Sequence, residues 1–61
     1  MEDREIRLVV IALMRSVTHL RVAVEAMAPA DPTIAASLQA SAAALEDAVD
    51  RIERAAVHER A

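Results

Sequence analysis

From Ile6 to Met27 the chain reads IRLVVIALMRSVTHLRVAVEAM, and this segment indicates how the whole molecule packs. Apolar residues recur in it at alternating steps of four and three, the spacing of a heptad repeat abcdefg with apolar a and d positions. Valine occupies each a position, and Ile, Leu or Met occupies each d position. The resulting seam consists of Ile6, Val10, Leu13, Val17, Leu20, Val24 and Met27. It predicts a helix whose apolar stripe packs against another helix.

The composition of the chain favours helices throughout. Its 61 residues include no Gly, no aromatic residue and only two Pro, so strands and long loops are not expected. We therefore predict an all-α fold with a single helical-hairpin domain over residues 1–61. Helix 1 is expected at about 2–27 and helix 2 at about 32–59, with a connection at 28–31.

The predicted boundaries follow from the residues around the two prolines. Pro29 cannot continue the helical hydrogen-bond ladder, and it should move Ala28 out of the α region. Asp31 should cap helix 2 by accepting hydrogen bonds from the first backbone N–H groups. Pro32 then occupies the first helical position, where its missing N–H is no loss. The sequence therefore predicts a short connection between two well-defined helix ends.

Helix 2 carries a seam that matches the seam of helix 1. Its members are Ala35, Leu38, Ala42, Leu45, Val49, Ile52 and Ala56. Folded back antiparallel, the two seams pair so that the residue numbers of every pair sum to 62, as for Leu20 with Ala42. Each a residue then meets a d residue, and most layers set a large side chain against a smaller one. This is the register of an antiparallel coiled-coil hairpin.

The charges agree with an antiparallel arrangement of unlike helices. Segment 6–27 contains three Arg and one Glu, whereas segment 34–57 contains four acidic residues and two Arg. Helix 1 is thus net positive and helix 2 net negative. Each exposed pair between them would contribute only about 0–1 kcal/mol.

A lone hairpin would leave much of helix 1 uncovered. Seven consecutive apolar residues, Leu8–Met14, wrap all sides of the helix, and a chain this short rarely builds a sufficient core alone. We therefore expect a homodimer in which two hairpins form a four-helix bundle. The residues expected at this protein interface are Leu8, Val9, Ile11, Met14, Val22, Ile34, Ala48 and Ala55. Alternatively, Leu8, Ile11 and Val22 form a groove for a helix of a different protein.

Few residues in the sequence suit catalysis or metal binding. The absence of cysteine excludes thiol chemistry, and the absence of glycine argues against a phosphate-binding loop. Neither His19 nor His58 has a carboxylate three or four positions earlier, the spacing found in di-iron bundles. We therefore expect no enzyme activity, no catalytic or metal-binding residue, no cofactor and no small-molecule substrate.

Nucleic-acid binding is an alternative function, because Arg4, Arg15 and His19 lie on helix 1. In length and in layered packing the chain resembles the repressor of primer family, whose members are dimeric two-helix bundles that bind RNA. This resemblance is architectural and involves no shared sequence motif. The net charge of -3 and the lack of aromatic residues for base stacking oppose nucleic-acid binding. The main prediction is therefore a non-enzymatic interaction module that acts as an adaptor, chaperone or regulatory subunit.

Sequence features also bear on location and source. The longest uninterrupted apolar run, Leu8–Met14, is far shorter than the roughly 20 residues of a membrane-spanning helix. The acidic segment 2–5 does not resemble a signal peptide. We expect a cytoplasmic protein without membrane contact. The absence of Lys, Asn, Phe and Tyr beside abundant Ala and Arg indicates GC-rich coding and a bacterial source.

Overall fold

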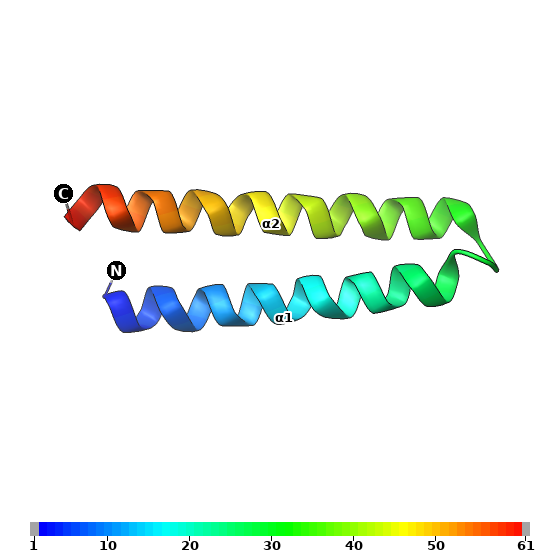
Figure 1. Cartoon of the computed structure of the whole chain (residues 1–61), viewed down its shortest axis with the longest axis horizontal. Coiled ribbons are helices and arrows are strands. Elements are labelled where there is room, and N and C mark those ends of the chain that lie inside the picture. Colours follow the sequence, from blue (N-terminus) through cyan, green and yellow to red (C-terminus); the bar gives the residue numbers. More distant parts are fainter. Residues whose placement is uncertain (1, 61) are drawn as a thin grey trace.

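The computed structural model describes residues 2–60, and within this range the chain forms two long helices. Helix α1 spans Asp3–Met27 and helix α2 spans Pro32–Arg60. The helices lie side by side and antiparallel, so the start of α1 and the end of α2 both lie opposite the connection (Figure 1). The Cα atoms extend over 47 × 16 × 11 Å. The predicted all-α hairpin is therefore confirmed.

Helix α1 begins at Asp3, in agreement with the start that the sequence predicts at about residue 2. Glu2 has an extended backbone, with φ -68° and ψ 150°, and its side chain makes no capping hydrogen bond. Its carbonyl oxygen instead accepts the first helical hydrogen bond from the N–H of Ile6, at 3.0 Å. Asp3 and Glu5 place negative charge in the first turn, where the exposed N–H groups and the helix dipole favour it.

The connection differs from the prediction at Ala28. This residue keeps α-helical angles, φ -52° and ψ -44°, although Pro29 follows it. Its N–H donates to the carbonyl four residues earlier at 2.9 Å, and those of Ala30 and Asp31 donate to the Met27 carbonyl at 3.0 and 2.7 Å. These three hydrogen bonds offset the steric bias before proline. The expected shift of Ala28 out of the α region was therefore wrong.

The predicted cap of α2 is confirmed. The Oδ1 atom of Asp31 accepts hydrogen bonds from the backbone N–H groups of Thr33 and Ile34, both at 3.1 Å. Pro32 occupies the first helical position, as expected. The cap satisfies two N–H groups that have no partner inside the helix.

The two seams form the core between the helices. All fourteen seam residues are buried or half-buried. The fully buried ones are Val17, Ala35, Ala42, Val49 and Ala56. Ala42, at the middle of α2, has an exposed fraction of 0%. Ile6 and Ala56, a predicted pair, line the same pockets at the open end of the hairpin, in agreement with the predicted register.

Burial within the seam differs between a and d positions. All five buried residues occupy a positions, whereas every d residue is only half-buried. The d residues carry the longer side chains: Ile6, Leu13, Leu20, Met27, Leu38, Leu45 and Ile52. Packing of the two helices therefore buries most of the smaller side chains at a positions. It leaves part of the larger side chains at d positions accessible to solvent.

Candidate interaction surfaces

The e positions of both helices form one side of the hairpin, the charged flank. Its residues are Arg7, Met14 and Arg21 of α1 and Gln39, Glu46 and Glu53 of α2. The Nη2 atom of Arg21 donates to Oε1 of Glu46 and forms an ion pair between the helices. Both side chains are about half exposed, 51% and 41%, so this pair contributes no more than about 1 kcal/mol.

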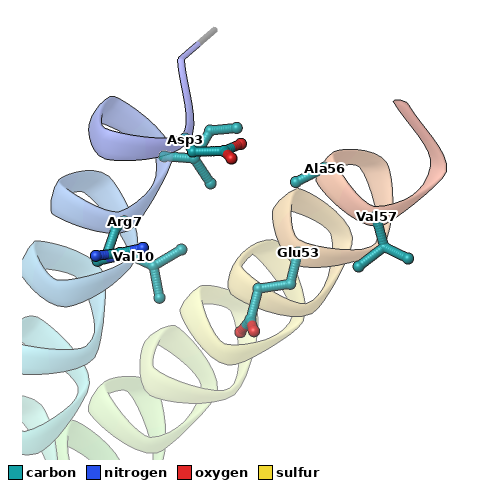
Figure 2. Close-up of a pocket in the computed structure, with 7 residues that line it drawn as sticks. Asp3, Arg7, Val10, Glu53, Ala56 and Val57 are labelled. Atoms are coloured by element: carbon teal, nitrogen blue, oxygen red, sulfur yellow. The ribbon is translucent and has the colours of Figure 1, made fainter. Parts of the chain in front are cut away.

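An open pocket lies on the charged flank near the ends of the chain (Figure 2). Asp3, Arg7 and Val10 line it from α1, and Glu53 and Val57 line it from α2. Its charged groups are thus two carboxylates and one guanidinium, all on exposed residues. The pocket is open to solvent and its lining combines these charged groups with apolar side chains.

The g positions form the opposite side of the hairpin, the uncharged flank. Its residues are Val9, Ser16, Ala23, Ile34, Ser41, Ala48 and Ala55. Four of the predicted interface residues lie here, namely Val9, Ile34, Ala48 and Ala55. Val9 and Ile34 are exposed large apolar residues, and Ala48 is half-buried. This flank is therefore a strip of small and apolar side chains along both helices.

The outer face of α1 comprises b and f positions, which point away from α2. Leu8 and Val22 are exposed there by 57% and 60%, and Ile11 is also exposed. The exposed residues Arg15 and Thr18 lie between them along the helix. No helix in the described range is long and apolar enough to cross a membrane.

The eight predicted interface residues therefore divide among three surfaces. Four lie on the uncharged flank and three on the outer face of α1, while Met14 lies on the charged flank between Arg7 and Arg21. These surfaces point in different directions around the hairpin. One second hairpin can lie against only one of the two flanks, so it cannot cover all eight residues.

Val57 is an exposed apolar residue that the sequence prediction did not include. Its exposed fraction of 63% is the largest among the exposed large apolar residues of the described range. It lies at a b position near the end of α2 and lines the pocket on the charged flank. The only sequence signal was an apolar residue outside the a, d and g positions, close to the expected end of the helix.

The three candidate nucleic-acid contacts, Arg4, Arg15 and His19, are all exposed. They lie on the half of α1 that points away from α2, and Arg4 and Arg15 are separated by about 16 Å along the helix. Each could reach a phosphate separately. The chain has no Phe, Tyr or Trp on which a base could stack.

Three hydroxyl groups bond to the backbone of their own helix, and acidic residues form no metal-binding group in the described part of the chain. The hydroxyls of Ser16, Thr18 and Ser41 donate to the backbone carbonyl four residues earlier, at 3.2, 3.1 and 3.2 Å. Among residues 2–60 no group of three His, Cys, Asp or Glu is placed to hold a metal ion. The described side chains offer mainly surfaces for helix packing.

Comparison of the chain with protein-family models, with curated proteins and with solved structures gives no significant match. The surfaces of the hairpin itself are therefore the features that bear on function. Among these, the incompletely covered seam is the feature with the clearest physical consequence.

Proposed function

We propose that this chain is a small, non-enzymatic interaction module of the cytoplasm. In this proposal two hairpins associate into a four-helix bundle, which acts as an adaptor, chaperone or regulatory subunit. Helix–helix packing supplies the binding energy. A second hairpin would complete a core that one chain builds only in part.

The supporting observation is the incomplete burial of the seam. The fully buried residues are three Ala and two Val, and no Leu, Ile or Met in the described range is fully buried. Full burial of such a large side chain contributes about 1.5–3 kcal/mol, and partial burial contributes correspondingly less. A chain below about 70–80 residues also rarely gains more than about 3–5 kcal/mol from its own core. Association is the available way to increase that burial.

Molar mass in solution tests this proposal. Sedimentation equilibrium over about a hundredfold range of protein concentration should show a mass that rises from one chain toward two. The thermal unfolding midpoint, followed by circular dichroism, should rise over the same range because only the folded chain associates. A well-folded monomer at every concentration would contradict homodimerisation. The exposed apolar residues would then indicate a helix of a different protein as the partner.

A second candidate function is RNA or DNA binding through α1. The exposure of Arg4, Arg15 and His19 on the same half of α1 favours it. Fluorescence anisotropy with a structured RNA and with duplex DNA at low salt tests it. Binding that weakens with added salt and with Arg15→Gln, but not with Arg54→Gln on α2, would support this function. An unchanged anisotropy at all protein concentrations would contradict it.

A further inference from the structure

We propose that the second copy of the chain docks on the uncharged flank, so that d and g residues of both hairpins form the core of the bundle. This inference rests on the proposed self-association and specifies which side of the hairpin serves it. It leaves the charged flank and the outer face of α1 on the outside of the dimer.

The first support is the unequal burial within the seam. Five of the seven a residues are buried, whereas none of the seven d residues is. Around a helix, each d position lies between an a position and a g position, and each a position lies next to e. Because the a side faces the partner helix, the uncovered part of each d side chain lies beside the uncharged flank.

A hollow at the open end of the hairpin shows this relationship directly. Ile6 and Ile52, which occupy d positions on the two helices, line it together with Ala55 at a g position, and Ala56 and the acidic Glu59 complete the lining. The small side chain of Ala55 leaves both isoleucines accessible from this side. An apolar side chain of a second hairpin would fit against the two isoleucines and Ala55, with the Glu59 carboxylate left at the solvent-facing edge.

The g side chains also suit close packing along the middle of the hairpin. Ser16 lies one turn from Leu13 on α1, and Ser41 lies one turn from Leu45 on α2. Small residues beside large ones allow a second pair of helices to interdigitate with the leucines. Val9 and Ile34 extend the apolar strip near the two ends of the hairpin.

Charge distinguishes this flank from the other one. Between residues 6 and 55 no d or g position carries a charged side chain, and Glu59, near the end of α2, is the charged d residue outside this range. On the charged flank, by contrast, Arg7, Arg21, Glu46 and Glu53 would all have to be removed from water. Burial of a charge that lacks a partner is costly, and even paired charges often fail to recover the loss of hydration. The uncharged flank is therefore the side that can be covered at the lower cost.

The exposed area is of the size that a second copy would cover. The hairpin exposes 4665 Å², whereas a compact protein of 6.6 kDa exposes about 3,900 Å². The excess of about 800 Å² follows from the elongated shape of the hairpin, and it is similar to the roughly 800 Å² that each partner contributes to a stable interface of ordinary size. A second copy presents the same uncharged strip, so a two-fold axis brings two such strips together and closes the assembly.

The test compares two matched substitutions on α1, Ser16→Glu and Thr18→Glu. Both residues are exposed, and both hydroxyls donate to the carbonyl four residues earlier, so the local effects on the helix are alike. Ser16 lies on the uncharged flank and Thr18 on the outer face of α1. Sedimentation equilibrium of the full chain gives the dimer dissociation constant of each variant. We expect Ser16→Glu to raise it by about tenfold or more, and Thr18→Glu to change it by less than about threefold.

Every other pattern of results counts against this inference. Equal weakening by both substitutions, weakening by Thr18→Glu alone, or no effect of either would place the interface on another surface while leaving self-association intact. A parent chain that stays monomeric would refute the proposed self-association itself. The failures of the two proposals are therefore distinguishable.

Thiol labelling provides a second readout that does not depend on an added charge. The chain has no cysteine, so Ser16→Cys and Thr18→Cys each introduce a single reactive thiol. The alkylation rate of each is measured at low and at high protein concentration. We expect the thiol at position 16 to become protected as the dimer forms and the thiol at position 18 to stay reactive. Equal reactivity of both thiols in the dimer would overturn the inference.

Discussion

Arg21 of α1 and Glu46 of α2 form an ion pair across the hairpin, although 25 positions separate them in the sequence. Both residues occupy e positions, so their contact shows that the e positions of the two antiparallel helices lie on the same side. The g positions consequently lie together on the other side. This one relationship gives the hairpin a charged flank and an uncharged flank with the seam between them.

The Arg21–Glu46 pair is predicted to add little to stability. A double-mutant cycle with Arg21→Ala, Glu46→Ala and the double variant should give a coupling of about 0–1 kcal/mol, because both side chains are exposed. The coupling should decrease as salt is added. Chemical denaturation of the four proteins measures it. A coupling above about 2 kcal/mol would mean that the pair is removed from water, as it would be if a partner covered the charged flank.

Truncation of the large seam residues should be costly. Leu13→Ala and Leu45→Ala are each expected to lower the free energy of unfolding by about 2–5 kcal/mol. Both leucines are half-buried within one hairpin, so the full effect should appear at concentrations where the chain is associated. The exposed control Arg15→Ala should change stability by less than about 0.5 kcal/mol. If Leu45→Ala denatured like the parent, Leu45 would contribute nothing to a core.

Enlargement of the most buried alanine should also destabilise the hairpin. Ala42 is completely buried between the helices, so Ala42→Leu would force the seam apart and cost about 1–3 kcal/mol. Ala40→Leu, at an exposed position on the same helix, is the matched control and should be nearly neutral. Thermal melts followed by circular dichroism measure both. Equal melting temperatures for the two variants would show that the helices do not approach closely at Ala42.

The cap of α2 can be tested through Asp31. Its carboxylate accepts two backbone hydrogen bonds, from Thr33 and Ile34. Replacement by Ala should reduce stability by about 0.5–2 kcal/mol, whereas Asn retains an accepting oxygen and should cost much less. Urea denaturation of both variants provides the comparison. An Asp31→Ala variant as stable as Asp31→Asn would argue against the cap.

The helices and their buried seams could be predicted well from the sequence. Both begin and end within one residue of the expected positions, and every predicted seam residue is at least half-buried. Heptad spacing predicts the two helices well here because the chain has no glycine or aromatic residue that would favour a turn or a strand instead. The roles of Asp31 and Pro32 at the start of α2 could be predicted because helix capping depends on neighbouring residues alone.

Other features depend on packing that the spacing of residues does not describe. Val10 and Val17 both occupy a positions of α1, yet only Val17 is fully buried, because coverage depends on the side chains opposite and on distance from the open end. Ala28 stays helical because three backbone hydrogen bonds outweigh a steric bias. The predicted interface residues were chosen as apolar residues outside the seam, and their division among three surfaces follows only when both helices are placed together.

The two ends of the hairpin lie at the same end of the molecule (Figure 1), and this arrangement has a mechanical consequence. A force that pulls the two ends apart would unzip the helices instead of shearing them. The layer of Ile6 and Ala56 would open first, and the turn at Asp31 would open last. Because each step breaks the contacts of a single layer, a lone hairpin should yield at low force. A second hairpin packed along both helices would contact several layers at once. The same force would then have to break more contacts before the two helices separate.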